Sequence, residues 1–233
     1  ALPACECLMA KHGADPNAPD FSQETPLFGA AREGLEAVVE LLLAQSCDPN
    51  RPNKLGETAL FGALRRGRAH TTTALLKNGA NPDHRSSNGQ TAAFFAVRPG
   101  CALALERLLS AGTDLAAAVD NISRTALFAA EDTESAQVLL DHRCDVHTRD
   151  RSGQTALFAA VQAEREAIAR LLLNHGAEAT VADTDGRTAL HFARGRQTQL
   201  LLEAKAEVDA CDSGQQTPLF FAAARGDGGG GAA

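Results

Sequence analysis

The chain has 233 residues, of which 22% are charged and 44% apolar, and its formal net charge is −7. This composition is typical of a folded protein in water, and the length suffices for a packed core. No apolar stretch approaches the roughly 18 residues that cross a bilayer, so we expect no membrane segment. The six cysteines are scattered along a chain that is large enough to fold without disulfides, which predicts a reduced, intracellular and cytoplasmic protein.

A short motif that begins with threonine recurs seven times and sets the periodicity of the chain. It reads Thr, Pro or Ala, Leu or Ala, then Phe or His, and successive copies are 33, 33, 34, 30, 33 and 29 residues apart. The copies begin at Thr25, Thr58, Thr91, Thr125, Thr155, Thr188 and Thr217. A second marker, similar to Gly-Ala-Asp, follows each of the first six copies, and one further marker lies at 13–17. Two markers that stay in step predict an array of repeated units.

Each unit is expected to begin with a short first helix. The threonine hydroxyl can cap this helix by accepting a hydrogen bond from a backbone amide. In the first complete unit, Pro26 suits the first helical position, and we expect the helix to run to about Glu33 and to end at Gly34. A second, Leu-rich helix follows, and a glycine such as Gly79 is expected to form its left-handed cap. The loop that leads to the next threonine is rich in Asp and Gly, which favours a tight turn.

Two units are shorter than the others. From the threonine to the small residue of the second marker, most units take 22 residues, whereas the fourth takes 19 and the sixth takes 18. Losses of this size are close to one helical turn, so we expect shortened helices or a trimmed turn and an unbroken stack. The small residue is Cys47 in the first unit and Cys144 in the fourth, which predicts that both thiols are buried.

This helix–turn–helix–loop unit resembles the ankyrin repeat. The matching residues are the Thr-Pro-Leu opening at 25–27, the Leu pairs of the second helices, and Gly-Ala-Asp-Pro-Asn at 13–17. The resemblance implies an all-α ankyrin-repeat solenoid of stacked helix-turn-helix units with projecting loops. Ankyrin units usually carry His as the fourth residue of the opening, and only His191 keeps it here. The other copies carry Phe28, Phe61, Phe94, Phe128, Phe158 and Phe220. We expect these rings to form an apolar, edge-to-face column.

We predict a single domain over residues 1–227 and a glycine-rich tail over 228–233. The units are a half unit at 1–17, complete units at 18–50, 51–83, 84–117, 118–147, 148–180 and 181–209, and a half unit at 210–227. Solenoids need terminal units with a polar outer face, and neither half unit clearly supplies one. We therefore expect a fragment of a longer protein.

The sequence does not indicate catalysis, a cofactor or a metal. Cys5 and Cys7 lack the spacing and the second pair of common zinc sites. His142 is expected near the end of a second helix, where a cation suits the helix dipole. The run that begins at Asp183 resembles part of a calcium loop, but Arg194 stands where the loop needs glutamate. We predict that the chain is not an enzyme and holds no cofactor and no metal.

The resemblance places partner binding at the loop tips and on the inner face of the first helices. Counted from each threonine, these positions lie six, four, three and one residues before it, and seven and eight after it. In units two to five their bases are Lys54, Arg65, Arg66, Arg85, Arg98, Arg124, Arg149 and Arg151, and their acids are Glu57 and Asp132. We hypothesise that these bases form a basic stripe that binds an acidic or phosphorylated segment. Arg suits this role because its guanidinium binds carboxylate or phosphate through two hydrogen bonds. The alternative is that these bases are ordinary solvated charges.

We expect a monomeric protein-interaction module that serves as a scaffold, an adaptor or a regulatory segment, with another protein as its partner. A membrane partner is not expected. Nucleic acid suits the chain less well, because the net charge is negative and only Phe21 among the variable positions could stack on a base. The alternative function is the ankyrin region of a larger enzyme or channel whose active domain lies outside this chain.

Overall fold

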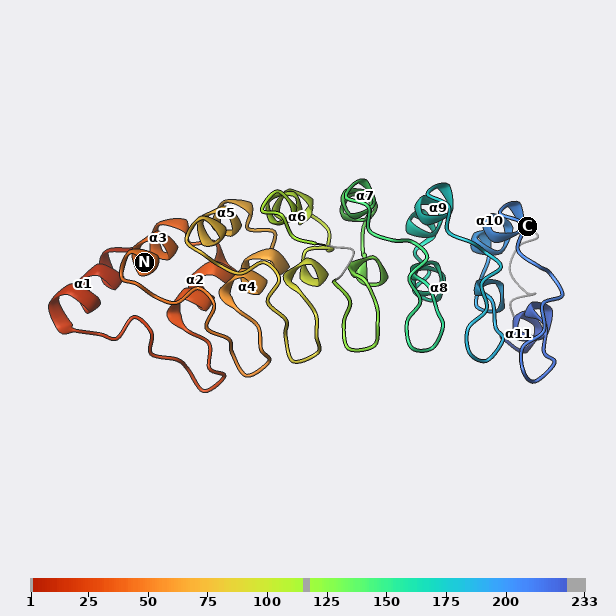
Figure 1. Cartoon of the computed structure of the whole chain (residues 1–233), viewed down its shortest axis with the longest axis horizontal. Helices are drawn as coiled ribbons and strands as arrows, with labels where there is room; N and C mark the ends of the chain where they lie inside the picture. Colours follow the sequence, from red (N-terminus) through yellow and green to blue (C-terminus); the bar gives the residue numbers. More distant parts are fainter. Residues whose placement is uncertain (1, 115–117, 226–233) are drawn as a thin grey trace, which may run out of the picture. The chain divides into compact units, whose positions relative to one another are not determined.

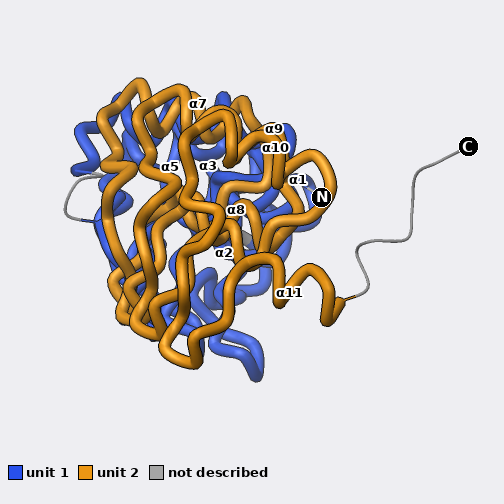
Figure 2. The backbone as a smooth tube through the Cα atoms, turned by 90° about the vertical axis from the view of Figure 1, so that its right-hand side faces the viewer, with its two compact units in different colours: residues 1–121 blue, residues 122–233 orange. Residues whose placement is uncertain are grey.

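The computed structural model describes residues 2–114 and 118–225, so the predicted tail at 228–233 lies outside the described residues. The chain divides into two compact units, which we call unit 1 (residues 1–121) and unit 2 (residues 122–233) (Figure 2). The described residues form helices, and one isolated bridge pairs Ala182 with Thr188. The division into a single domain of six complete units and two half units stays a prediction.

Unit 1 is built from two layers of helices (Figure 1). Its helices are α1 (Leu2–His12), α2 (Pro26–Glu33), α3 (Glu36–Ala44), α4 (Ala59–Arg65), α5 (Ala69–Lys77), the 3-10 helix η1 (Ala92–Phe95) and α6 (Ala102–Leu109). The first helices α2, α4 and η1 lie side by side, and so do the second helices α1, α3, α5 and α6. The loops project from the layer of first helices.

Unit 2 repeats the same arrangement. Its elements are η2 (Ala126–Ala129), α7 (Thr133–Asp141), α8 (Ala156–Gln162), α9 (Glu166–Asn174), η3 (Ala189–His191), α10 (Arg196–Glu203) and α11 (Pro218–Arg225). The first helices η2, α8, η3 and α11 form one layer, and the second helices α7, α9 and α10 form the other (Figure 1). This confirms the predicted fold class, a solenoid of helix-turn-helix repeats.

The first complete repeat follows the sequence prediction closely. Helix α2 begins at Pro26 and ends at Glu33, and the Thr25 hydroxyl accepts a hydrogen bond of 3.2 Å from the amide of Phe28. Gly34 ends the helix with a left-handed φ of 75°, a conformation that glycine adopts without strain. The residue types that start and stop this helix therefore act as predicted.

The threonine hydroxyl is not the general helix cap that the sequence predicts. The hydroxyls of Thr58, Thr91 and Thr155 are buried and have no hydrogen-bond partner among the described residues. At Thr58 and Thr91 the amide that a cap would satisfy donates instead to the threonine carbonyl, at 3.0 Å from Phe61 and at 3.1 Å from Phe94. The first turn is tight enough to satisfy this amide from the backbone, so the hydroxyl receives no donor.

The shortened units lose most of their first helix, as expected. In the repeat at 118–147 the first helix is η2, of four residues, and in the repeat at 181–209 it is η3, of three residues. Their second helices, α7 and α10, keep nine and eight residues. The repeat at 84–117 has the usual spacing, yet its first helix is η1, of only four residues. Pro99 explains this difference, because proline lacks the amide that would bond to the preceding turn and disfavours helical backbone at Arg98.

The phenylalanines are mostly buried, but the predicted column is wrong. Phe61 and Phe158 are 0% and 1% exposed. Their rings contact a phenylalanine one position further along the next first helix: Phe61 lies 5.2 Å from Phe95, and Phe158 lies 6.2 Å from Phe192, between ring centroids. These pairs are tilted, and no ring contact joins Phe28 to Phe61 among the described residues. Each ring therefore meets a phenylalanine at a different position of the next repeat.

Candidate protein-binding surface

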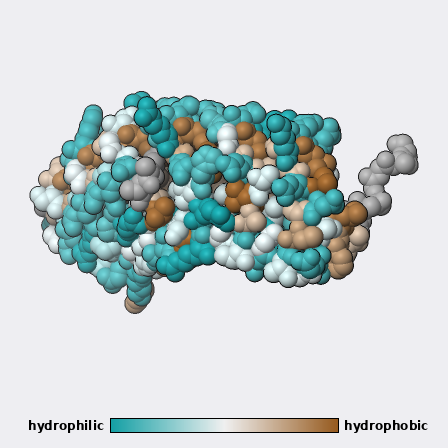
Figure 3. All heavy atoms as spheres, turned by 45° about the vertical axis from the view of Figure 1, so that its right-hand side comes forward, coloured by the Kyte–Doolittle hydropathy of each residue, from teal (hydrophilic) through white to brown (hydrophobic). Residues whose placement is uncertain are grey.

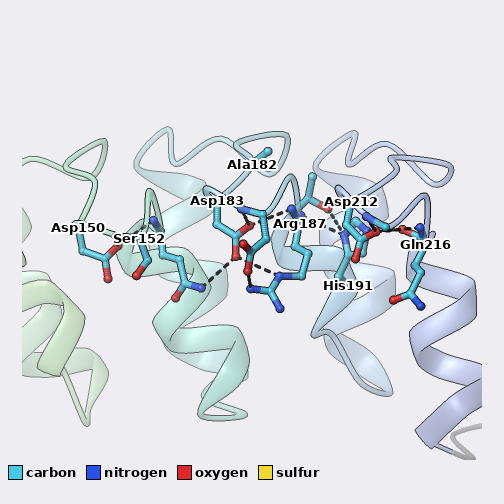
Figure 4. Close-up of polar contacts among 12 residues, drawn as sticks. Asp150, Ser152, Ala182, Asp183, Arg187, His191, Asp212 and Gln216 are labelled. Atoms are coloured by element: carbon cyan, nitrogen blue, oxygen red, sulfur yellow. Dashed lines mark hydrogen bonds and ion pairs between the residues drawn. The ribbon is translucent and has the colours of Figure 1, made fainter.

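Each loop is organised by one polar side chain five residues before the threonine. Asp150 Oδ1 accepts hydrogen bonds of 2.9 Å from the amides of both Ser152 and Gln154 (Figure 4). The equivalent residues that accept amide hydrogen bonds within their own loops are Asp20, Asn53, Ser86, Asp183 and Asp212. Such turns hold the loop backbone in one conformation, so each loop presents its other side chains in the same way.

Neighbouring loops are joined by a repeated backbone hydrogen bond, which we call the loop ladder. The amide four residues before one threonine donates to the carbonyl three residues before the preceding threonine. In unit 1 the pairs are Lys54 to Ser22 at 3.0 Å, Ser87 to Leu55 at 2.9 Å and Asn121 to Asn88 at 3.0 Å. In unit 2 they are Arg151 to Ile122 at 3.0 Å, Thr184 to Ser152 at 2.9 Å and Ser213 to Asp185 at 2.8 Å. Within each unit the ladder fixes the spacing of the loop tips.

His191 makes a side-chain tie between loops that phenylalanine at the same position cannot make. Its ring is 0% exposed; Nδ1 accepts from the amide of Thr188 at 3.0 Å, and Nε2 lies 3.2 Å from the carbonyl oxygen of Gln216 in the next loop (Figure 4). The ring therefore connects its own repeat to the following one. Loop positions in this part of unit 2 are held by side chains as well as by backbone.

Two of the predicted binding residues, Arg85 and Arg149, are engaged in holding the loops. Arg85 Nη1 donates to the carbonyl of Gly89 in its own loop at 3.1 Å and to Val119 in the next loop at 2.5 Å. Arg149 makes the equivalent bonds to its own loop and to the carbonyl of Ala182. Both occupy the position six residues before a threonine, so this is one structural device used twice.

Arg65 is also partly committed within the protein. It forms an ion pair of 2.5 Å with Glu57, which is 5% exposed, and its guanidinium carbon lies 4.6 Å from the ring centroid of Phe95. The preceding repeat contains the same pair, Arg32 with Glu24 at 3.0 Å. Arg32 is not among the predicted binding residues, because the positions were counted only from the repeat at 51–83 onward. The signal was present, since Arg32 lies seven residues after its threonine, as Arg65 does.

The remaining predicted bases are more accessible. Lys54, Arg66, Arg98 and Arg151 are exposed, and Arg124 is half-buried. Arg98 and Arg124 each also interact with other groups of the protein. Unit 1 carries Lys54, Arg65, Arg66, Arg85 and Arg98, and unit 2 carries Arg124, Arg149 and Arg151. The predicted stripe thus consists of a larger set in unit 1 and a smaller set in unit 2.

Two cysteines singled out in the sequence are buried in the core, and one histidine lies at a helix end. Cys47 and Cys144 are 5% and 4% exposed, as predicted, and burial raises the pKa of both thiols. A protonated thiol is a poor nucleophile and metal ligand. His142 lies at the end of α7, where Nδ1 is 2.9 Å from the carbonyl oxygen of Val138. In the described ranges no group of three or more His, Cys, Asp or Glu side chains is placed to hold a metal ion.

The described helices are all too short or too polar to cross a membrane. On the face that Figure 3 shows, hydrophilic residues cover much of the surface, with smaller apolar areas between them.

Comparison with known proteins agrees with this architecture. The model described as "Ankyrin repeats (3 copies)" matches residues 27–119, 63–150, 104–183 and 126–198, and "Ankyrin repeat" matches 185–213. The crystal structure of the ankyrin repeat domain of Bcl-3, described as a unique member of the IkappaB protein family, is similar in fold. It has a TM-score of 0.71 and 29% sequence identity, with coverage of 85% of this chain and 93% of that chain. No curated protein sequence matches the chain.

Ankyrin repeats are protein-interaction modules and are typically not catalytic, which fits a partner-binding role for this chain. The family matches extend from residue 27 to residue 213. With its two-layered helix pairs and its ladder of loops, the chain belongs to the ankyrin repeat family.

Proposed function

We propose that this chain binds an acidic or phosphorylated segment of another protein through bases on the loop tips and first-helix ends, mainly in unit 1. The observation that supports the proposal most directly is the exposure of Lys54, Arg66 and Arg98. Lys54 lies on a loop tip, Arg66 directly follows α4, and Arg98 follows η1. These positions recur in every repeat, so a segment that runs along the repeats passes them in turn.

The chemistry of these side chains favours an anionic group. A guanidinium binds carboxylate or phosphate through two parallel hydrogen bonds, and its planar fork is preorganised for this geometry. The chain as a whole carries a net charge of −7, so a local set of bases contrasts with its surroundings. Such a contrast steers an acidic segment to one surface and away from the rest of the protein.

The other predicted bases contribute through position and field. Arg65 is paired with Glu57, and Arg85 and Arg149 donate to loop carbonyls. These bonds help to hold the loops, including the two that carry Lys54 and Arg151. Arg124 and Arg151 belong to the smaller set of bases in unit 2.

The test reverses three accessible charges together. We would prepare the variant Lys54→Glu/Arg66→Glu/Arg98→Glu and leave Arg65 unchanged, because losing its pair with the buried Glu57 would disturb folding. The matched control reverses three exposed bases on the second helices of unit 1, namely Lys11, Lys77 and Arg107. Helicity and the denaturation midpoint should be equal in all three proteins before binding is compared.

Binding would be measured in two ways. Immobilised proteins would capture partners from a cell extract for mass spectrometry, and fluorescence polarisation would follow a labelled peptide rich in glutamate and phosphoserine. We expect the loop variant to bind this peptide at least about tenfold more weakly, the size of one lost charged contact, and the control to bind as the parent does. Equal binding by the loop variant and the parent would show that these bases are solvated charges and that the proposal is wrong.

A further inference from the structure

A groove crosses the layer of second helices in unit 1. The helices α3, α5 and α6 lie side by side there, with α5 in the middle (Figure 1). Two connected hollows, of about 400 and 320 Å³, share four lining residues, Glu36, Ala69, His70 and Leu103. Together they extend from Gly67, just before α5, to Asn78, just after it. The groove thus follows the length of α5, and its two walls belong to α3 and α6.

Small side chains on α5 open this groove. Ala69 and Thr73 lie four residues apart and therefore on the same side of the helix. In the repeat at 148–180 the equivalent positions hold Glu166 and Arg170, which form an ion pair of 3.3 Å on α9. The Thr73 hydroxyl donates to the carbonyl of Ala69 at 3.0 Å and so turns back to its own helix. The outer side of α5 is therefore a recess where α9 carries two long charged side chains.

The two walls of the groove carry opposite charges. Glu36 and Glu40 lie four residues apart on α3, and Arg107 lies on α6 at the other wall. Lys77 adds a second base in the last turn of α5. All four side chains are exposed, and none of them has an ion-pair partner among the described residues. The walls do not neutralise each other, so charges of both signs are available to a ligand.

An apolar side chain lies among these charges. Leu103 is 50% exposed and precedes Arg107 on α6 by four residues, which is about one helical turn. On the floor of the groove, the Asn78 amide group donates to the carbonyl of Ala74 at 2.9 Å, so it is satisfied within its own helix. The groove therefore offers an apolar contact with charged groups around it, an arrangement that is common in protein interfaces.

The length of the groove suits a helix. Helix α5 has nine residues and is about 13 Å long, which corresponds to about two and a half turns. We propose that this groove binds an amphipathic helix of another protein that carries apolar residues along the centre of its contact face. Bases on one edge of that face pair with Glu36 and Glu40, and acids on the other edge pair with Lys77 and Arg107. Binding of this kind places the apolar residues of the ligand helix on Leu103.

This site is separate from the basic surface of the proposed function. Lys54, Arg66 and Arg98 do not line the groove. An acidic segment that suits those bases would meet Glu36 and Glu40 here, and like charges repel. Only a ligand with both signs of charge matches both walls. The two surfaces therefore select different partners.

The test uses two helical peptides that are held in shape by a side-chain staple. Both carry leucine along the centre of one face; the mixed peptide has lysines on one edge and glutamates on the other, whereas the basic peptide has lysines on both. Fluorescence polarisation gives the affinities, and backbone amide shifts in NMR spectra locate the bound peptide. We expect the parent to bind the mixed peptide at least about fivefold more tightly, the size of one exposed charge interaction. The shifts should lie on α3, α5 and α6.

Two variants of equal net charge test the walls. Lys77→Glu/Arg107→Glu, the groove variant, makes both walls acidic and should reverse the preference, so that the basic peptide binds more tightly. Lys54→Glu/Arg66→Glu changes the net charge by the same amount outside the groove and should keep the preference of the parent. Far-ultraviolet circular dichroism would establish that both variants are as helical as the parent.

A second pair of variants tests the apolar contact. Leu103→Glu should weaken binding of the mixed peptide at least about fivefold, because a carboxylate buried under the ligand is left unpaired. The control Leu55→Glu changes a leucine on a loop that is 61% exposed and should bind the mixed peptide as the parent does.

Four results would overturn the proposal: a mixed peptide that does not bind, equal binding of the two peptides by the parent, amide shifts outside the three helices, or a groove variant that keeps the preference of the parent. Self-association of the parent in sedimentation velocity, abolished in the groove variant, would make a second copy the occupant and would also overturn it. A failure of the acidic peptide to bind the basic surface would leave this proposal standing, because its peptides and variants are different.

Discussion

Two neighbouring repeats of unit 2 place different side chains at the same position. Phe158, in the repeat at 148–180, is 1% exposed and packs against Phe192. His191, in the repeat at 181–209, is 0% exposed and bonds to Thr188 and to the carbonyl of Gln216. The ring of His191 also lies 5.4 Å from that of Phe221, in an edge-on arrangement. Both repeats are packed at this position, but only one is also hydrogen-bonded.

The two repeats also differ in the hydrogen bonding of their threonine hydroxyls. In the histidine repeat, the Thr188 hydroxyl lies 3.1 Å from Nδ1 of His191. In the phenylalanine repeat, the Thr155 hydroxyl is buried without a hydrogen-bond partner among the described residues. An unsatisfied buried hydroxyl costs stability. Phenylalanine thus makes the apolar contact at this position but offers no hydrogen-bond partner to the threonine hydroxyl.

The largest expected effect comes from removing the ring of Phe158. Phe158→Ala leaves a cavity between first helices and should lower the free energy of unfolding by about 3–5 kcal/mol. The measurement is the midpoint and slope of urea denaturation followed by circular dichroism. The control Phe21→Ala removes a ring that is 96% exposed and should leave the midpoint nearly unchanged. Equal midpoints for Phe158→Ala and the parent would mean that the ring is not a packing residue.

The next effect tests the hydrogen bonds of the histidine repeat. His191→Phe keeps an aromatic ring but removes the acceptor for the amide of Thr188 and the contact to Gln216. We expect a loss of about 1–3 kcal/mol, the usual cost of leaving a buried polar group unsatisfied. Urea denaturation again provides the measurement. A variant as stable as the parent would show that phenylalanine satisfies this repeat as fully as histidine does.

A smaller effect, of opposite sign in the two repeats, is expected at the threonines. Thr155→Val replaces an unpaired buried hydroxyl by a methyl group of similar shape, and its extended backbone, with φ −101° and ψ 172°, suits a β-branched residue. It should stabilise the protein by about 1 kcal/mol, whereas Thr188→Val should destabilise it by about as much. Differential scanning calorimetry of both variants gives the signs. Shifts of the same sign would contradict the comparison.

The smallest effect concerns the tie between these two repeats. Arg149 donates to the carbonyl of Ala182 across the loops, and Arg149→Met keeps the length of the side chain while removing its donors. The side chain is exposed, so we expect a loss of only about 0.5–1 kcal/mol. Hydrogen exchange at the amides of 182–187 should be faster in this variant. Unchanged exchange there would show that the loop ladder holds the loops without Arg149.

Sequence patterns predict the structure best where one residue type has one physical role. Gly34 ends α2 as predicted, and Cys47 and Cys144 are buried at the small-residue position. They fail where several groups compete for the same hydrogen-bond partner. The hydroxyl of Thr58 was expected to cap α4, but the amide of Phe61 bonds to the Thr58 carbonyl instead. The binding residues remain a prediction, and the structure refines it by separating bases that hold loops from bases that are accessible.

The sequence by itself determined the repeat, the all-α fold and the order of first helix, second helix and loop. These follow from the helix and turn preferences of the residues and from a motif that recurs about every 33 residues. Only the tertiary structure decided which phenylalanine rings meet, which arginines bond to neighbouring loops, and which apolar side chains stay uncovered. Those outcomes depend on how adjacent repeats pack and on which side chains that packing covers. A motif that encodes one repeat at a time carries no information about either.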